Sequence, residues 1–573
     1  PAKRRRLSVE NQIQQWRLAP PAFPVIAAGS TGSIPSTRAL LSAVLKLPLG
    51  AVVLPGLDAE LPTKTWKEVS REVTHPQFGF TELLDACDAT PDQVQLWPGV
   101  EQTSQVARAN ILSQALLPPE ATADLEAGWR AQAGQGVAEG VETAFQDVSL
   151  LEVEDDDQEA QTIALALREG LDRPAFISAL VTPDRMLAQR VKGHLQRWGI
   201  EPDDSAGLRL EEAPAFKFAR IVLDVVESRF GHFALLALLH HPLCQLALPE
   251  PVRQRGRAFL DLHVLRHTPS GDCLEPLFKQ LDKVQEESGA AEAYQVLEAL
   301  RRETNVLAEQ AMISTNWTAL DWIIGLIETL EGLSRRNGEE AEATVWTQSN
   351  AEDVARFFND WSQALSQRDS ESQSLALPVF RSLMERAATG VSLRSPFVGH
   401  PRVLILSGIE ARLTSADRII LGGLNEGTWP AETQPGPWMS RPMRRDFGLP
   451  AVERRIGLSA HDFCQAFGRK EVILTRAAIV DGGATVPSRF IKRLKAFLKI
   501  VEAEHVLRPV GPAFDLAAAE IDRAPRFEPA KRPRPRPPLS GRPKKFSVTA
   551  VERWIANPYE TYARYSLRLR KLD

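Results

Sequence analysis

Residues 424–445 carry the side chains with the clearest chemical potential in this sequence. The run LNEGTWP at 424–430 follows an apolar stretch, 417–421, that is typical of a buried strand closed by two glycines. Ligands of α/β proteins bind where strands end, and a polar, aromatic and cationic edge suits a phosphate or a nucleic-acid strand. The predicted nucleic-acid-binding residues are Asn425, Glu426, Trp429, Arg441, Arg444 and Arg445.

Two alternatives to DNA contact stay open for this segment. Core packing is the alternative for Trp429 and for Trp438, because large aromatic side chains are usually buried. The three arginines are too dense to be buried without partners, so they are expected to contact either a DNA backbone or a partner protein.

A second candidate is the loop of Gly29, Ser30, Thr31 and Gly32, which follows a predicted strand at 24–28 and precedes a predicted helix. Backbone N–H groups and a helix N-terminus can cradle phosphate at such a place, and a simple tight turn is the alternative. The loop is no P-loop, because GxxxxGK[ST] occurs nowhere in the chain and no lysine lies between Lys3 and Lys46.

We predict no metal site and no catalytic residue. The acidic run at 154–159 lies where a helix is expected to begin, so helix capping explains it better than magnesium binding does. The histidines at 240, 241, 263 and 267 fall in apolar helical stretches, where packing is commoner than metal binding.

Length and hydrophobic patterning predict an α/β protein with a large helical insertion. A chain of 573 residues corresponds to roughly three to four domains, since domains average about 150 residues. Two βα patterns, at 24–54 and 176–198, indicate parallel strands, whereas 211–395 lacks strand signals. The expected parts are 1–150 (α/β), 151–210 (the start of a second α/β domain), 211–395 (all-α), 396–510 (the rest of the second α/β domain), 511–545 (linker) and 546–573 (the start of another domain).

Composition restricts the compartment and the position of any DNA site. The net charge of -5 means that a DNA site must be local. The cysteines, at 87, 244, 273 and 464, are widely separated, so neither disulfides nor a zinc site is expected and a reducing cytoplasm fits. No apolar run is long enough to span a membrane. The chain starts at Pro1 without a signal-peptide pattern, and we expect a piece of a longer polypeptide.

The linker alternates cations with prolines at 531–538 and again at 541–545. Such a segment stays extended and cannot pack a core. A solubilising tether and a contact with DNA phosphates are the two interpretations left open.

The run GLNEGTWP resembles the strand-end element of the UvrD-like superfamily 1 DNA helicases. The wider pattern resembles the AddB family, which supplies one subunit of bacterial AddAB helicase–nucleases in double-strand break repair. The blocks that carry this resemblance lie at 25–35, 53–58, 179–185 with 203–207, and 409–413. The resemblance implies RecA-like, P-loop-NTPase-like helicase domains with an all-α insertion. Residues 546–565 resemble the opening helix of a PD-(D/E)XK nuclease, whose metal-binding residues lie further downstream in that family.

The resemblance also implies that the motor is degenerate. Glu410 resembles the glutamate that contacts the nucleotide sugar, although a surviving structural glutamate is the alternative. The triplet Thr475-Arg476-Ala477 matches the γ-phosphate arginine motif by letters but follows a strand, so Gln465 falls at the arginine position. Asn557-Pro558 stands where some relatives have Cys-Pro, so no iron–sulfur cluster is expected.

Together these expectations describe a helicase-like body that binds or scans single-stranded DNA and scaffolds an AddA-type subunit. Single- and double-stranded DNA are the expected nucleic-acid partners, with no membrane partner. Magnesium and ATP are expected for the full complex, with no cofactor in this chain. An active ATPase half with Walker motifs upstream is one alternative, and a structural subunit without DNA contact is the other.

Overall fold

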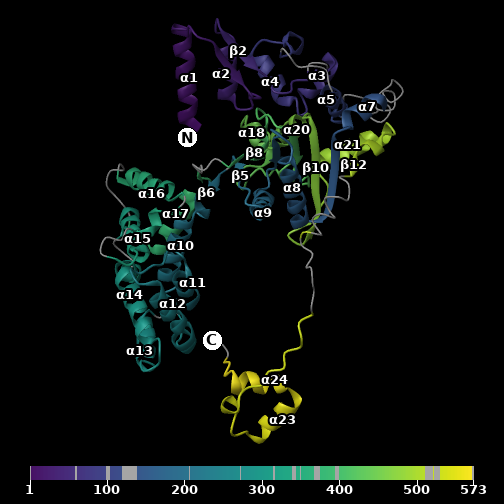
Figure 1. Ribbon diagram of the computed structural model, residues 1–573. Helices are drawn as coiled ribbons and strands as arrows, with labels where there is room; N and C mark the ends of the chain where they lie inside the picture. The colour runs from purple at the N-terminus through teal and green to yellow at the C-terminus, as the bar shows by residue number, and fades with distance from the viewer. Residues whose placement is uncertain are drawn as a thin grey trace. The chain divides into compact units, whose positions relative to one another are not determined.

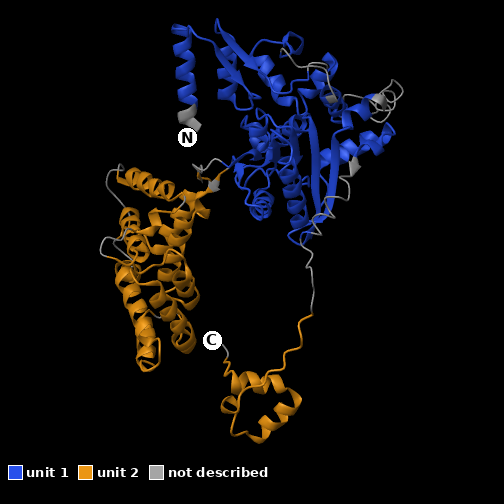
Figure 2. Ribbon diagram, viewed as in Figure 1, with its two compact units in different colours: residues 1–206, 396–525 blue, residues 207–395, 526–573 orange. Residues whose placement is uncertain are grey.

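The computed structural model describes most of the chain, and its described residues form two compact units. The described ranges are 2–58, 61–97, 104–118, 138–205, 207–270, 273–313, 317–338, 343–348, 350–366, 374–393, 399–509, 521 and 529–570. One unit comprises residues 1–206 and 396–525, and the other comprises residues 207–395 and 526–573 (Figure 2).

A parallel sheet of seven strands forms the centre of the first unit (Figure 1). In spatial order its strands are β12 (Arg508–Pro509), β3 (Val148–Asp155), β10 (Glu471–Val480), β9 (Arg418–Leu421), β4 (Ser178–Val181), β8 (His400–Leu406) and β5 (Pro202–Asp204). A further strand, β11 (Gly483–Ala484), pairs antiparallel with the end of β10. All residues of β4 and β9 are buried, as expected for strands covered on both faces. The predicted α/β class is therefore confirmed.

Helices cover both faces of this sheet. Successive side chains along a strand point to opposite faces, so they pack against different helix layers. In β4, Leu180 packs with α8 (Asp156–Gly170) and α9 (Arg185–Gln196), whereas Ala179 and Val181 belong to the core on the opposite face. The helices of that opposite core are α5 (Ser104–Ala115), α7 (Ala138–Phe145), α20 (Arg454–Phe467) and α21 (Arg489–Ile500).

The packing of the large sheet begins upstream of residue 151, where the sequence placed a domain border. Ile111 of α5 and Phe145 of α7 lie in the same core as Phe463 of α20. The reason is long-range packing, because the apolar faces of α5 and α7 are buried against elements more than 300 residues further along the chain. No local sequence signal marks such a partner.

A smaller α/β part of the first unit contains the βαβ pattern predicted at 24–54. Strand β1 (Val25–Ala28) pairs in parallel with β2 (Gly50–Val53), and α2 (Pro35–Leu45) connects them. Leu41, Phe80 and Leu83 form its core. The other helices of this part are α1 (Ala2–Leu18), α3 (Thr63–Val69) and α4 (Phe78–Ala86).

The second unit is predominantly helical between residues 207 and 395. Its first and last strands, β6 (Leu208–Arg209) and β7 (Ser392–Leu393), pair antiparallel, so the segment leaves where it enters. Large apolar side chains such as Phe216, Trp322 and Phe358 fill one continuous core. The helices are α10 (Pro214–Glu227), α11 (His232–His240), α12 (Glu250–Phe259), α13 (Glu275–Asp282), α14 (Ala290–Ile313), α15 (Ala319–Ser334), α16 (Ala351–Ser366) and α17 (Leu377–Ala388).

The C-terminal segment begins with an extended stretch that continues to Pro538. Most of the predicted linker before it, at 511–520 and 522–528, lies outside the described residues. A short turn at Leu539–Gly541 precedes α23 (Val548–Ala556) and α24 (Pro558–Thr561). None of the helices in the described part of the chain combines the length and apolar character that crossing a bilayer requires. All four cysteines are free.

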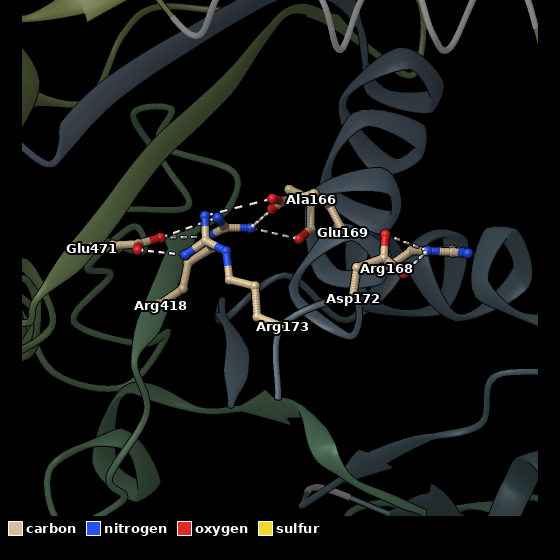
Figure 3. Close-up of polar contacts among 7 residues, drawn as sticks. All are labelled: Ala166, Arg168, Glu169, Asp172, Arg173, Arg418 and Glu471. Carbon is tan, nitrogen blue, oxygen red and sulfur yellow. Dashed lines mark hydrogen bonds and ion pairs between the residues drawn. The ribbon is translucent and has the colours of Figure 1, made fainter. Parts of the chain in front are cut away.

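A buried guanidinium fastens the amino-terminal edge of the large sheet. Arg418, at the start of β9, has a side chain that is 6% exposed. It donates to the Ala166 carbonyl at 2.8 Å and to a Glu169 carboxylate oxygen at 2.5 Å, both on α8. It also donates to Glu471 of β10 at 3.1 Å, and Arg173 donates to the same carboxylate at 2.6 Å (Figure 3). This network joins two strands to a helix.

We predict that Arg418→Ala lowers the free energy of unfolding by about 2–3 kcal/mol, because it removes a buried guanidinium whose hydrogen bonds join the Ala166 carbonyl, Glu169 and Glu471. Arg173→Ala is the matched control, since Arg173 is 41% exposed and its loss is expected to cost under about 1 kcal/mol. Urea unfolding followed by tryptophan fluorescence measures both. Equal shifts in the two variants would contradict the role assigned to Arg418.

Candidate functional site

The loops that follow β4, β8 and β9 open at one edge of the large sheet. Val181, the last residue of β4, lies opposite Leu406 of β8 and Leu421 of β9, which are the last residues of those strands. Because the strands are parallel, the segments that follow them meet at the carboxyl edge, where α/β proteins bind ligands. The predicted LNEGTWP segment leaves β9 at this edge.

A buried carboxylate holds the turn after β9. Glu159 of α8 is 2% exposed, and its Oε1 accepts the Gly423 N–H at 2.8 Å and the Thr475 hydroxyl at 2.6 Å. Burial raises the pKa of the Glu159 carboxyl, and the nearby Asp184 carboxylate raises it further, while the two hydrogen bonds oppose the shift. Glu159 therefore connects α8, β10 and the turn through one group.

Asn425 lies inside the protein, at 4% exposure. Its Nδ2 donates to the Ala477 carbonyl at 3.0 Å, and its Oδ1 accepts from Arg476 Nε at 3.0 Å and from the Thr485 hydroxyl at 3.2 Å. The side chain thus uses its hydrogen-bonding capacity on β10 and the segment after it. It joins the loop to the sheet and presents no group to a bound strand.

Trp429 is also buried, at 2% exposure, and its indole N–H donates to the Gly422 carbonyl at 3.1 Å. The Ser488 hydroxyl donates to the Trp429 carbonyl. The ring belongs to the core that α20 and α21 share with the sheet. Trp429 therefore packs in the core, as the alternative interpretation of this residue proposed, and neither face of its ring is open to a base.

Glu426 lies on the surface of the same loop. Its carboxylate pairs with the Arg489 guanidinium at the start of α21 and accepts the Arg489 backbone N–H at 3.2 Å. A lone carboxylate would repel a phosphate, but this charge is balanced by a half-exposed arginine. Glu426 and Arg489 together form a neutral rim to the loop.

The three arginines lie on a short exposed helix, α19 (Arg441–Asp446), in which no residue is buried. Arg441 pairs with Glu453, and this hydrogen bond lowers the pKa of the Glu453 carboxyl. Arg444 donates to the Pro450 carbonyl at 3.1 Å. Arg445 is 82% exposed and lies 3.8 Å from Asp446. Arg445 therefore holds the most available charge of the three.

Large apolar side chains surround these arginines without being covered. Trp438 is 89% exposed and Phe447 is 70% exposed, with Met443 and Leu449 also on the surface. We call residues 438–449 the α19 surface. Arginines beside exposed aromatic rings can neutralise phosphates and stack bases, and the same mixture is enriched in protein interfaces. Phe447 was not among the predicted site residues, although its place directly after a charged turn is a usable signal.

A pocket of about 240 Å³ lies at the same edge but is lined by carboxylates. Arg190 pairs with two of them, Asp156 at 2.9 Å and Asp481 at 3.3 Å. The acidic lining disfavours a phosphate inside this pocket. Within the described residues, no group of three or more His, Cys, Asp or Glu is placed to hold a metal ion. The carboxylates that line the pocket are Asp156, Glu159, Asp184, Glu426 and Asp481.

The loop of Gly29 to Gly32 forms a tight turn beneath packed side chains. Gly29 and Gly32 both have positive φ, at 80° and 64°. A β carbon on Gly29 would lie 2.6 Å from Leu413 Cδ1, and Thr31 is 3% exposed. Ser30 Oγ accepts the Gly32 N–H at 3.2 Å. The turn uses its own groups and is covered by Leu413, which is unlike an open phosphate cradle.

Glu410 is occupied by local hydrogen bonds. Its Oε2 accepts from the Ser407 N–H at 3.0 Å, the Ser407 hydroxyl at 2.6 Å and the Ser205 hydroxyl at 2.5 Å. Partial burial opposes ionisation, but these hydrogen bonds lower the pKa of the Glu410 carboxyl. The residue closes a capping box at the start of α18 (Gly408–Ala411), which is a structural role.

Gln465 and Arg476 lie in different elements, α20 and β10. Gln465 of α20 approaches Gly56 so closely that a β carbon there would overlap its amide group. Arg476 lies inside β10, which continues to Val480, so the triplet Thr475-Arg476-Ala477 belongs to the strand that it was predicted to follow. Its guanidinium is buried and bonds Asn425, Glu152 and Thr485. The Arg476 guanidinium is thus fully engaged in hydrogen bonds that hold the loop.

Helix α20, which carries Gln465, packs against the smaller α/β part of the first unit. His461 meets the edge of Phe80 with ring centroids 5.4 Å apart, and Arg454 pairs with Glu82. Gly457 approaches the backbone, since a β carbon there would lie 2.6 Å from the Val73 carbonyl oxygen.

The comparisons with known proteins identify no function. No family model matches the chain. It is 23% identical over 255 residues to the uncharacterized protein RC0550 of Rickettsia conorii, and 22% identical over 245 residues to an uncharacterized protein of Rickettsia felis. These matches cover 43% and 42% of this chain but only 28% and 27% of the two relatives, so the chain matches less than a third of their length.

We predict opposite effects for two glycine substitutions in helices. Gly193→Ala in α9 meets nothing within 4 Å, so it should raise the free energy of unfolding by about 0.5–1 kcal/mol through helix propensity. Gly457→Ala gains the same propensity but meets a backbone carbonyl, and it should lower the free energy of unfolding by about 1–3 kcal/mol. Thermal unfolding of both variants measures the difference. Stabilisation by Gly457→Ala would show that α20 is not tightly packed on the smaller part.

Proposed function

We propose that this chain is part of an AddB-type subunit of a bacterial helicase–nuclease that acts in recombinational repair of double-strand DNA breaks. Its role is that of a degenerate superfamily 1 helicase body that binds or scans single-stranded DNA and holds an AddA-type motor subunit. The full complex would use ATP and magnesium, act on double-stranded DNA ends and work in the cytoplasm.

The α/β class and the helical segment support this proposal. A RecA-like helicase domain is a parallel sheet covered by helices, and residues 207–395 are inserted between β5 and β8 of such a sheet. The short helices from residue 548 are compatible with the opening of a PD-(D/E)XK nuclease domain.

Degeneracy of the motor is supported by the packing around the expected nucleotide contacts. Leu413 covers Gly29, and Gln465 lies against Gly56. A glutamine carries no charge with which to stabilise a phosphoryl group in transit. Glu410 is used by Ser205 and Ser407. We infer that this chain has a helicase architecture without the chemistry of a motor.

The observation that carries DNA binding is the α19 surface. It exposes Arg445, whose side chain is 82% exposed, together with the rings of Trp438 and Phe447. Guanidinium groups bind phosphates and exposed rings stack bases regardless of sequence, which is what a strand-holding body requires.

We predict that changing Arg441, Arg444 and Arg445 together to Ala weakens binding of labelled single-stranded DNA. Each phosphate contact contributes about -0.7 to the slope of log affinity against log salt, so the slope should flatten by about 2. Fluorescence anisotropy across a salt series measures this change.

The matched control changes Arg301, Arg302 and Arg356 to Ala, which removes the same charge from exposed positions on α14 and α16. Wild-type affinity and slope in the α19 variant, or equal losses in the control, would overturn the assignment of DNA binding to this surface.

We also predict that the purified chain hydrolyses no ATP, with or without DNA, and degrades no DNA in the presence of magnesium. The reasons are the missing P-loop and Gln465, and the downstream position of the nuclease residues in the resembling family. A coupled phosphate-release assay and a labelled-DNA assay measure these activities. DNA-stimulated hydrolysis above background, or nuclease activity absent from a mock preparation, would favour an active enzyme.

A protein partner is a second candidate for the α19 surface. Four uncovered apolar side chains, at 438, 443, 447 and 449, favour it, because exposed aromatic anchors are typical of protein interfaces. If the triple arginine variant keeps its DNA binding while Trp438→Ala and Phe447→Ala abolish assembly with an AddA-type subunit, the chain is a structural subunit at this surface.

A further inference from the structure

Residues 531–545 form the most cationic segment of the chain. They contain seven lysines and arginines and no aspartate or glutamate, so they carry a formal charge of +7. Because the whole chain carries -5, the remainder carries -5 - 7 = -12. A polyanion is therefore attracted locally to this segment and repelled by the rest of the chain. The seven cations are Lys531, Arg532, Arg534, Arg536, Arg542, Lys544 and Lys545.

All seven cations are exposed, and none forms an ion pair within the part of the chain that the structure describes. One guanidinium, that of Arg542, donates to the Pro537 carbonyl at 2.9 Å. The α19 arginines differ, since Arg441 and Arg445 each lie within ion-pair distance of a carboxylate. The charges of residues 531–545 are thus available without breaking an ion pair in that part of the chain.

The backbone of residues 531–538, which come before the turn at Leu539–Gly541, is extended before any ligand arrives. Residues 529–538 have neither helix nor strand, and proline occupies 533, 535, 537 and 538 (Figure 1). Proline fixes φ and removes the N–H, which favours the polyproline II conformation at about 3.1 Å per residue. Such a segment loses little backbone entropy on binding and distributes its side chains around its axis.

We propose that residues 531–545 bind the phosphate backbone of single-stranded nucleic acid without reading its sequence, as a site separate from the α19 surface. Four of the seven cations are arginines, whose planar guanidinium groups match phosphate oxygens better than ammonium groups do. The ring of Tyr559, and the face of Trp554 that does not stack on Phe546, follow closely in the chain and can stack bases. This inference does not depend on the proposed function.

An anionic membrane is the competing class of ligand, and the helix after the segment argues against it. Helix α23 exposes Val548, Trp554 and Ile555, as an interfacial helix would. Its charged residues, however, are one glutamate and one arginine, whereas membrane-surface helices carry a polar face rich in lysine and arginine. Four of the cations, at 531, 532, 534 and 536, lie upstream of the helix in an extended stretch, which follows a strand more readily than a planar surface.

The experiment compares two variants of the full 573-residue chain. One changes Arg532, Arg534 and Arg536 to Ser, and the matched control changes Pro533, Pro535 and Pro537 to Ala, which keeps every charge. The probe is a fluorescein-labelled oligothymidylate of about 30 nucleotides, and anisotropy is measured from about 50 to 200 mM salt. Both variants alter exposed or half-exposed positions outside helices and strands, so unchanged circular dichroism is expected.

The serine variant should flatten the salt slope by about 2, so that its loss of affinity between about 50 and 200 mM salt is about 20-fold smaller than that of wild type. The proline variant should keep the wild-type slope. An unchanged slope in the serine variant overturns the inference. The inference is also overturned if that variant loses binding to phosphatidylserine vesicles and keeps binding to the oligonucleotide.

The α19 triple variant, measured in the same series, separates the two sites. Loss of slope in the α19 variant alone would leave the proposed function standing and reject the role of residues 531–545. Loss of slope in the serine variant alone would support this inference and reject DNA binding by the α19 surface.

Discussion

The buried carboxylate of Glu159 is the constraint on which the carboxyl edge of the sheet depends. It accepts a backbone N–H from the turn after β9 and a hydroxyl from β10, while its own residue belongs to α8. Burying a carboxylate is costly, and burial raises the pKa of this one. The two hydrogen bonds offset part of that cost and fix the position of Gly423. The position of Gly423 in turn sets where the chain enters the segment from Leu424 to Pro430.

The fixed turn divides the LNEGTWP segment into an inner and an outer part. Asn425 and Trp429 face inward, where they satisfy Arg476 and the Gly422 carbonyl. Glu426 faces outward against Arg489. The buried network removes Arg476 from solvent, although by its letters it is the best match to a phosphate-binding motif. The exposed cationic groups that a ligand could contact therefore lie on α19, which follows the loop, and not on the loop itself.

The sequence predicted the elements better than it predicted the orientation of the side chains. The βαβ unit at 24–54, the strand before Gly422 and the helical nature of 211–395 followed from periodicity and glycine positions, which are local signals. The burial of Asn425 was not predictable, because it depends on Ala477 and Arg476, some 50 residues away. The approach of Gln465 to Gly56 joins positions about 400 residues apart. Such contacts are made by tertiary packing, and a single sequence contains no record of them.

The two cationic segments differ in how their charges are held, and this difference determines how they would act on one strand. The α19 arginines lie on a short helix and partly within ion pairs, so a phosphate must compete with Glu453 for Arg441. Residues 531–545 carry exposed charges that form no ion pair within the described residues, and their first part, 531–538, has an extended backbone. Counterion release depends on the number of phosphates neutralised, so the salt slopes of the two segments should add if both contact the same strand. Their affinities need not add, because a second contact on a bound strand is intramolecular and depends on effective concentration. A chain that is acidic overall can in this way hold a polyanion at a few chosen places and repel it elsewhere.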